Sequence, residues 1–325
     1  MMPALLYITS PEIHMGEDIL HEGLDNLLGP ERVHCYPFKD YAAFQYNLYP
    51  PMADHVPHRR PIGIARLIEH RNDIAGVVLT TRSPAPQTWA RIRGYFPEVP
   101  VALVNGEEGG GRLVFPPGLE CTQRFQMDLH PDEAQAGLHP MTMAAPPRVM
   151  LAEETTRDID VSYVVRNTCG LRLEVAHVLE REGFLVLVGA DIPREQFCWI
   201  LNRSKIAVSV RGAGTDTFRY WEIPYHGALL ASSRPPTLIP DNFVDGESAV
   251  FFDEPEELVV KVRALLADEP RLSRIAAAGK KLCHEKHTAA ARARYILETT
   301  GLGWLIEPSG DAGAAAPHPG PCPPG

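Results

Sequence analysis

The chain has 325 residues, of which 45% are hydrophobic and 22% are charged, and its formal net charge is −10. This length suggests about two domains, and the apolar content is too high for a disordered protein. The acidic balance argues against broad binding to a nucleic-acid backbone, which requires basic surfaces. It still allows a local anion site built from a few arginines and helix N-termini.

The N-terminal half of the chain alternates short apolar runs with helical periodicity. Strands are predicted at residues 4–8, 32–36, 74–80 and 99–104, and helices at 16–28, 61–71 and 87–95. Residues 41–60 are rich in Tyr, Pro and His without a period, so we expect a long loop over a site or an interface. Residues 129–147 carry prolines, histidines and methionines without a period and are interpreted as the boundary between two domains.

A second alternating series follows this boundary. Its strands are predicted at 159–165, 184–188, 206–210, 228–232 and 249–252, and its helices at 171–182, 194–202, 271–286 and 288–299. A further helix is predicted after Asp253, which would act as N-cap, with Pro255 in the first turn and Glu256 completing an Asp-x-x-Glu capping box. Beyond residue 308 the chain is mainly Gly, Ala and Pro, which predicts a disordered tail.

These elements predict two Rossmann-like, doubly wound α/β domains that face each other across a cleft. The predicted divisions are residues 1–145, residues 146–286, a helical segment at 287–305 and the tail at 306–325. Ligands of such folds bind beyond the carboxyl ends of parallel strands, so the cleft is the expected site.

The sequence also bears on compartment and metal binding. No stretch approaches the run of about 20 apolar residues that crosses a bilayer, and the N-terminus lacks the basic region of a signal peptide. Six cysteines occur without a CxxC pair, which is typical of reduced thiols. His284 and His287 have helix-like spacing but no third ligand. We therefore expect a cytoplasmic protein without a transmembrane segment or a metal site.

The loop after the strand at 206–210 carries the most informative residues. Four candidate ligand-facing residues occur there: Arg211, Gly212, Gly214 and Asp216. A Gly-rich loop between a strand and a helix lets backbone amides approach an anion closely. Glu222 lies about one turn into the following helix, where its carboxylate could accept two hydrogen bonds from a ribose diol. Arg219, on the same helical face, could pair with Glu222 or meet a phosphate.

The segments FRYWE at 218–222 and GALL at 227–230 resemble the Arg-x-x-Glu and Gly-x-x-x signature of CgeB-like (spore maturation protein) glycosyltransferases. That group is part of the wider group-1 family with the GT-B fold. The likeness continues through residues 243–252, 255–258, 275–281 and 287–288. It implies sugar transfer from a nucleotide-diphosphate-sugar donor, which is a co-substrate, with no metal or other cofactor. The resemblance places the donor on the C-terminal domain and the acceptor on the N-terminal domain, with Glu222 on the donor ribose.

Further site residues follow from this resemblance and from their positions. Arg166 and Arg172, after the strand at 159–165, resemble the diphosphate clamp of the family. Two guanidinium groups there would neutralise a leaving diphosphate, although surface ion pairs are the alternative interpretation. His14, in the loop after the first strand, is a candidate general base or hydrogen-bond donor near the acceptor, or an ordinary cap residue. Glu12 and the residues at 80–83 and 105–107 end strands of the same sheet.

The leading hypothesis is therefore a retaining, metal-independent glycosyltransferase whose acceptor is a glycan, a protein or a small molecule. The wider family has two glutamates separated by seven residues, and the first corresponds to Gly214 here. This departure supports an alternative, a non-catalytic nucleotide- or glycan-binding protein on the same fold. A nicotinamide-dependent enzyme is disfavoured because no GxGxxG follows a strand. The aromatic run at 41–49 suggests a homo-oligomer interface, and the final helix is expected to cross back to the N-terminal domain.

Overall fold

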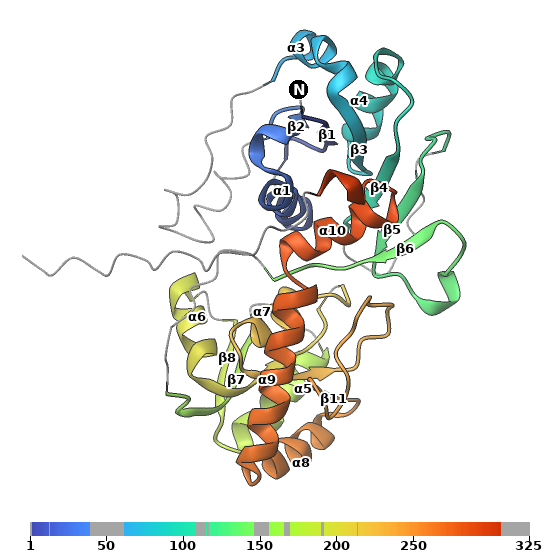
Figure 1. Cartoon of the computed structure of the whole chain (residues 1–325). Helices are drawn as coiled ribbons and strands as arrows, with labels where there is room; N and C mark the ends of the chain where they lie inside the picture. Colours follow the sequence, from blue (N-terminus) through green and yellow to red (C-terminus); the bar gives the residue numbers. More distant parts are fainter. Residues whose placement is uncertain are drawn as a thin grey trace, which may run out of the picture.

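The computed structural model describes residues 2–12, 14–39, 62–107, 115, 117–145, 156–165, 170–189, 192–212 and 214–306. These residues form two parallel β-sheets, each covered by helices on both faces (Figure 1). The fold class predicted from the sequence is therefore confirmed. The loop predicted at 41–60 and the tail predicted at 306–325 lie outside the described residues, except for Ile306.

The first sheet has six strands in the order β2-β1-β3-β4-β5-β6, and all neighbouring strands are parallel. Its strands are β1 Ala4–Ile8, β2 Val33–Tyr36, β3 Ile74–Thr80, β4 Val101–Asn105, β5 Gln123–Met127 and β6 Leu138–Met141. Its α-helices are α1 Met15–Leu28, α3 Ile64–Glu69 and α4 Ala85–Ile92. Short 3-10 helices occur at Pro30–Arg32, Arg71–Asp73, Arg93–Tyr95 and Pro131–Glu133.

The second sheet has five parallel strands in the order β11-β10-β9-β7-β8. Its strands are β7 Ile159–Val165, β8 Leu185–Val188, β9 Ser204–Ser209, β10 Leu229–Ser233 and β11 Val250–Phe252. The helices that follow in this half are α5 Gly170–Arg181, α6 Arg194–Arg203, α7 Phe218–Tyr225, α8 Pro255–Leu266, α9 Glu269–Lys286 and α10 Ala289–Thr299, with a 3-10 helix at Gly303–Leu305.

Two local expectations were wrong. β5 and β6 were not predicted, and β6 lies within the segment interpreted as a domain boundary. β6 is an edge strand, which tolerates Pro140 because one side of the strand needs no ladder hydrogen bond. The N-cap of α8 is Glu254 rather than Asp253, and its side chain makes no capping hydrogen bond. Instead, the Glu257 carboxylate accepts a hydrogen bond from the backbone N–H of Asp253 at 2.8 Å.

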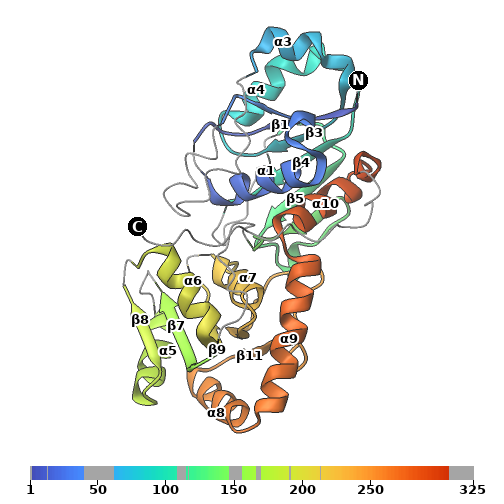
Figure 2. The same cartoon turned by 60° about the vertical axis from the view of Figure 1, so that its left-hand side comes forward.

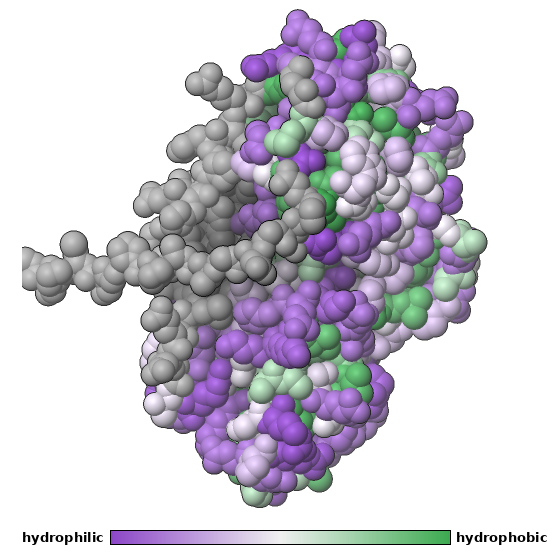
Figure 3. Space-filling model, viewed as in Figure 1, coloured by the Kyte–Doolittle hydropathy of each residue, from purple (hydrophilic) through white to green (hydrophobic). Residues whose placement is uncertain are grey.

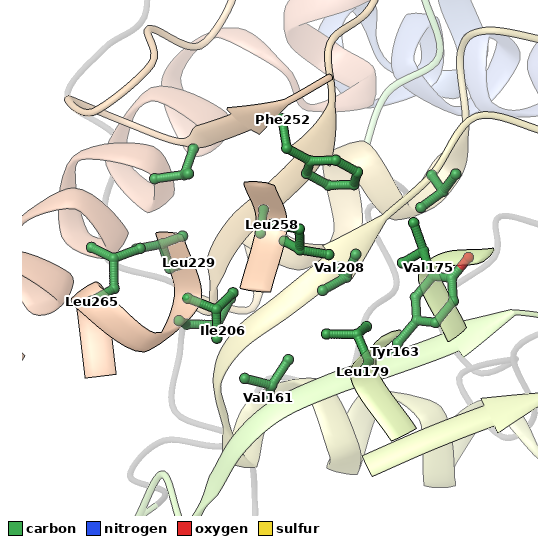
Figure 4. Packing of buried hydrophobic residues seen from close by; sticks show 14 of the residues in the cluster. Val161, Tyr163, Val175, Leu179, Ile206, Val208, Leu229, Phe252, Leu258 and Leu265 are labelled. Carbon is green, nitrogen blue, oxygen red and sulfur yellow. The ribbon is translucent and has the colours of Figure 1, made fainter. Parts of the chain in front are cut away.

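The core of the second domain explains why the sequences of its strands are continuous apolar runs. Side chains of β7, β9, β10 and β11 point toward α5 and α8 and are buried with them (Figure 4). Residues on the opposite face of these strands pack against α6 and α7 in a separate cluster. A strand covered on both faces buries every side chain, each large one contributing about 1.5–3 kcal/mol, so apolar residues occur without alternation.

Helices α9 and α10 connect the two halves. The buried residues of α9 follow helical spacing, at Leu272, Ile275, Ala276, Gly279 and Cys283. The surface over α8 and α9 on the face shown in Figure 3 is mainly hydrophilic. After His287 the chain turns and α10 packs beside α1 of the first domain (Figures 1 and 2). A Cβ at Gly23 of α1 would lie 2.2 Å from the carbonyl oxygen of Ala289, so only glycine permits this approach.

No helix within the described part of the chain is long and apolar enough to cross a membrane.

Candidate functional site

The Gly-rich loop lies where the two sheets face each other. It follows β9, the central strand of the second sheet, and leads into α7, whose N-cap is Thr217. The side chain of Asp128, which follows β5 of the first sheet, accepts hydrogen bonds from this loop. The backbone N–H of Met143, which follows β6, donates to Asp216 at 2.5 Å. The carboxyl ends of both sheets therefore contribute to one region, as expected for parallel sheets.

Arg172 holds the beginning of the loop. It lies in the first turn of α5 and is buried. Its Nε donates to the carbonyl oxygens of Val210 at 3.3 Å and Arg211 at 3.1 Å, and its Nη2 donates to Val210 at 3.2 Å. A Cβ at Gly212 would lie 2.5 Å from Arg172 Nη2, so the glycine leaves room for the guanidinium group. The predicted role of Arg172 at a diphosphate stays a prediction.

The backbone amides of the loop differ from the expected open anion cradle. Four of them donate to protein acceptors: Arg211 to Ser233 Oγ at 3.3 Å, Gly212 to the Gly214 carbonyl at 3.0 Å, and Thr215 and Asp216 to the Asp128 carboxylate at 3.2 and 3.1 Å. The Asp128 carboxylate of the opposite domain already accepts from two of these groups, and whether the loop binds a donor stays a prediction. The Arg211 side chain is exposed, and Gly214 is buried.

Asp216 joins the two domains. Its carboxylate accepts hydrogen bonds from the backbone N–H of Met143 and from Trp221 Nε1, the latter at 2.7 Å. Burial raises the pKa of Asp216 to about 7, while its two hydrogen bonds and the nearby Arg292 guanidinium oppose this shift. Asp216 was predicted to bind the donor, but here both oxygens already bind protein groups. Its role toward a ligand stays a prediction.

Glu222 pairs with a different arginine from the one expected. Its carboxylate is buried and forms an ion pair with Arg194, the first residue of α6. Arg219 instead donates from Nε to the carbonyl oxygen of Val164 at 2.5 Å. The predicted Arg219–Glu222 pair is therefore wrong, because Arg219 extends toward the end of β7. Whether Glu222 binds a ribose stays a prediction.

Glu222, Arg172 and Arg194 nevertheless lie near enough to Arg219 for their charges to act on it. Burial lowers the pKa of Arg219, the Glu222 carboxylate raises it, and the cations of Arg172 and Arg194 lower it further. The guanidinium carbons of Arg194 and Arg219 lie 5.0 and 5.5 Å from the centre of the Phe197 ring. Guanidinium groups outnumber the carboxylate among these four side chains, which suits a polyanionic ligand.

Arg194 is a site residue that sequence analysis missed. A signal for it does exist, because the positive charge stands at the N-terminus of a helix, where the helix dipole disfavours it. A residue kept in such a position usually has another partner, and here the partner is Glu222. Arg166, the other half of the predicted clamp, lies outside the described residues.

The facing edge of the first sheet brings together the residues predicted at its strand ends. Arg82, after β3, forms ion pairs with Glu12 at 3.0 Å and Glu107 at 3.4 Å. His14 is the N-cap of α1, and its Nδ1 accepts a hydrogen bond from the backbone N–H of Glu17 at 3.4 Å. Burial and the Arg82 cation lower the pKa of His14. A neutral imidazole whose Nδ1 accepts this bond carries its proton on Nε2.

A buried polar cluster beneath His14 was not predicted. Glu17 Oε2 accepts a hydrogen bond from the Thr9 hydroxyl at 2.5 Å. Lys39 Nζ lies 2.7 Å from Asp18 and 3.9 Å from Glu17. Burial raises the pKa of both carboxyl groups, and the Lys39 cation opposes the shift. This cluster fixes the first turn of α1 and therefore the position of His14.

Metal ligands do not gather in this part of the structure. Among the described residues, no group of three His, Cys, Asp or Glu side chains is arranged to hold a metal ion. His284 stacks on Tyr225 with 4.2 Å between ring centres, and His287 contacts the carbonyl oxygen of Asp241 at 3.0 Å. Both histidines therefore have structural contacts.

A comparison with protein families gives one match, which lies within the second half of the chain. Residues 164–298 match the family model described as glycosyl transferase-like. The chain is therefore similar to this family over its second domain. This match covers β7 through α10 and includes Arg172, Arg194, Arg219 and Glu222. No curated protein sequence matches the chain at a significant level.

Solved structures are similar to this chain over both of its domains. HepE from Anabaena, in complex with UDP-glucose, aligns with a TM-score of 0.53 and 10% identity over 93% of this chain and 100% of its own. A glycosyltransferase from Rickettsia africae ESF-5 aligns with a TM-score of 0.57 and 8% identity over 95% of this chain and 100% of its own. An alpha-glucosyltransferase in complex with UDP-glucose and DNA containing an abasic site aligns with a TM-score of 0.60 and 9% identity over 92% of this chain and 99% of its own. These similarities establish the GT-B fold.

Proposed function

We propose that this glycosyltransferase domain binds a nucleotide-diphosphate sugar beside Glu222 and transfers the sugar to an acceptor held at the edge of the first sheet. The observation that carries the proposal is the cluster within the family match in which Glu222 pairs with Arg194 and the charges of Glu222, Arg172 and Arg194 act on Arg219. Two of the similar structures hold UDP-glucose, so UDP-glucose is the first donor to test.

Each residue has a defined part in this proposal. The Glu222 carboxylate accepts hydrogen bonds from the ribose diol while it keeps its ion pair with Arg194. In the transfer step an acceptor hydroxyl forms a bond to the anomeric carbon while the bond from that carbon to the diphosphate oxygen breaks. The proton of the hydroxyl passes to the departing diphosphate oxygen. Negative charge then grows on the diphosphate, and the Arg166, Arg172 and Arg219 guanidinium groups stabilise it.

Because arginines supply this positive charge, we propose transfer without a metal ion. Retention of the anomeric configuration is proposed from the resemblance to group-1 glycosyltransferases. His14 contributes the N–H of Nε2 as a hydrogen-bond donor to the sugar or the acceptor, since its Nδ1 caps α1. The acceptor is a glycan, a protein or a small molecule. The pattern Arg219-x-x-Glu222 supports membership in the CgeB-like branch. A cytoplasmic location and self-association of the chain are part of the same proposal.

Nucleotide binding tests the donor site. Isothermal titration of the full chain with UDP, GDP, dTDP and CMP should show binding of one nucleoside diphosphate. In a separate assay, the chain should slowly hydrolyse the sugar donor that carries this nucleoside diphosphate. Glu222→Gln should weaken that binding, because the amide offers one acceptor oxygen to a diol instead of two. Glu256→Gln, on the exposed side of α8, is the matched control. Equal affinity in both variants would remove Glu222 from the donor site.

The alternative is a nucleotide- or glycan-binding protein without turnover. It is favoured by Gly214, which places no carboxylate where the wider family has its first glutamate. Donor turnover separates the two functions. A binding protein would retain the nucleotide while the sugar donor stays intact for hours, with or without acceptor, whereas an enzyme releases the nucleoside diphosphate.

A further inference from the structure

Asp128 links the first domain to the loop of the second. It follows β5 and has a φ of 56°, a left-handed conformation that is uncommon for a residue with a side chain. Its carboxylate is buried and accepts hydrogen bonds from the backbone N–H groups of Thr215 and Asp216 and from the Thr215 hydroxyl. Beside it, the N–H of Leu238 donates to the Leu129 carbonyl at 2.8 Å.

The loop is therefore held by opposite charges at its two ends. The Arg172 cation binds the carbonyl oxygens of Val210 and Arg211 at the beginning. The Asp128 anion binds the amides of Thr215 and Asp216 at the end. Arg172 belongs to the same domain as the loop, whereas Asp128 belongs to the first domain. Because Thr217 begins α7 directly after these amides, Asp128 also fixes the start of the helix that carries Glu222.

We propose that Asp128 is a positioning residue for the nucleotide-sugar site of the opposite domain. It acts through the loop and the first turn of α7, without touching the donor. This inference rests on the proposed function, since it needs a donor beside Glu222. A carboxylate suits the role because its two oxygens accept from three donors at once, whereas an amide has a single acceptor oxygen and would turn an NH₂ group toward an N–H.

The test measures UDP affinity and donor hydrolysis with the full chain. Asp128→Asn should weaken UDP binding about 10- to 100-fold, the range expected when hydrogen bonds to a charged group are lost. The KM for UDP-glucose should rise by a similar factor, while kcat changes less. Asp132→Asn, at an exposed aspartate in the following 3-10 helix, is the matched control and should bind like the wild type.

Two variants at Thr215 distinguish positioning from a general loss of stability. Thr215→Ser keeps the hydroxyl and should bind UDP like the wild type, whereas Thr215→Val removes the donor to Asp128 and should weaken binding. The effects of Asp128→Asn and Thr215→Val should be less than additive, because both break the same contact. This comparison stands even if one variant melts at a lower temperature than the wild type.

The outcomes separate this inference from the proposed function. If the wild type binds no nucleoside diphosphate, the proposed function fails and the inference fails with it. If the wild type binds UDP and Asp128→Asn binds equally well, the donor site stands and the inference is wrong. Tighter binding by Asp128→Asn would also overturn it, since Asp128 would then be an internal anion that competes with the diphosphate.

Discussion

The two sheet edges that face each other use charge differently. At the edge of the second sheet, the ion pair of Glu222 and Arg194 has side chains that are 3% and 17% exposed. At the edge of the first sheet, Arg82 pairs with Glu12, and these side chains are 27% and 73% exposed. Buried charges are held in one geometry by their partners, whereas exposed pairs are screened and exchange partners with water.

This difference indicates a division of labour between the domains. A preorganised set of buried charges suits a donor whose diphosphate and ribose are constant features. The exposed pairs of Arg82 can adjust to an acceptor, whereas the fixed part of this edge is the capped first turn of α1, which the buried Lys39 and Asp18 pair supports. The following predictions test whether the Glu222–Arg194 pair is the rigid part of the facing edges and Arg82 with its partners the adaptable part.

The largest effect is expected from breaking the buried pair. Arg194→Ala should destabilise the chain by about 3–5 kcal/mol, because it leaves the buried Glu222 carboxylate without its partner. Arg82→Ala should cost about 0–1 kcal/mol, since its pairs are exposed. Urea unfolding at neutral pH measures both. Similar costs for the two variants would remove the distinction between the domains.

The next effect concerns space rather than charge. Gly212→Ala should lower the free energy of unfolding by about 1–3 kcal/mol, because the new methyl group would displace the Arg172 guanidinium from the loop carbonyls. Gly63→Ala is the control, as a Cβ there meets no atom within 4 Å. UDP affinity should fall only in Gly212→Ala. A fully stable Gly212→Ala that binds UDP normally would show that the loop is not tightly packed.

Asp216 predicts a pH dependence of stability. In the unfolded chain its carboxyl loses the proton near pH 3.8, but burial raises its pKa to about 7 in the folded protein. Between these values the folded state binds more protons, so this group lowers the free energy of unfolding as pH rises, by at most about 1.4 kcal/mol per pH unit. Asp128 and Arg292 face this carboxyl and act in opposite directions.

The measurement compares wild type with Asp216→Asn by urea unfolding at pH 5, 6 and 7. The variant cannot titrate at this position, so the difference in unfolding free energy between the two proteins should change steadily with pH. Other titrating groups cancel in that difference. A difference that is constant across the three pH values would mean that Asp216 is ionised throughout, held by its bonds to Met143 and Trp221.

Much of the fold was accessible from the sequence because buried parallel strands are apolar without interruption. The bounds of β1, β3 and β7 match the predicted ones. β5, with the sequence QRFQM, and β6, with LHPM, were missed because polar residues break their apolar runs. β5 takes its place in the sheet by pairing with β4, and β6 by pairing with β5, which are contacts between separate segments that local patterns do not encode.

The candidate site was predictable in position but not in its contacts. Glycines between a strand and a helix indicated the loop from the sequence. Its contact with Asp128 could not be predicted in this way, because Asp128 lies 87 residues before Thr215. Arg194 lies 28 residues before Glu222, whereas Arg219 is a helical neighbour of Glu222 and was the natural choice as its partner. An arginine can reach several acceptors, and only the packing of β7 against α6 and α7 decides which one it takes.

The smallest effect is expected at His14. Because its Nδ1 caps α1 in a partly buried position, His14→Asn, whose side-chain oxygen can accept the same hydrogen bond, should keep the helix capped and change stability by less than about 1 kcal/mol. The substitution removes the N–H of Nε2. If that group donates to the sugar or the acceptor, kcat should fall while UDP affinity stays unchanged.

If His14 is only a cap, the His14→Asn variant should turn over donor normally, and the His14→Ala variant should lose stability without any specific loss of kcat. A loss of activity that both variants share, with the asparagine variant as stable as the wild type, would therefore assign His14 to the adaptable acceptor side.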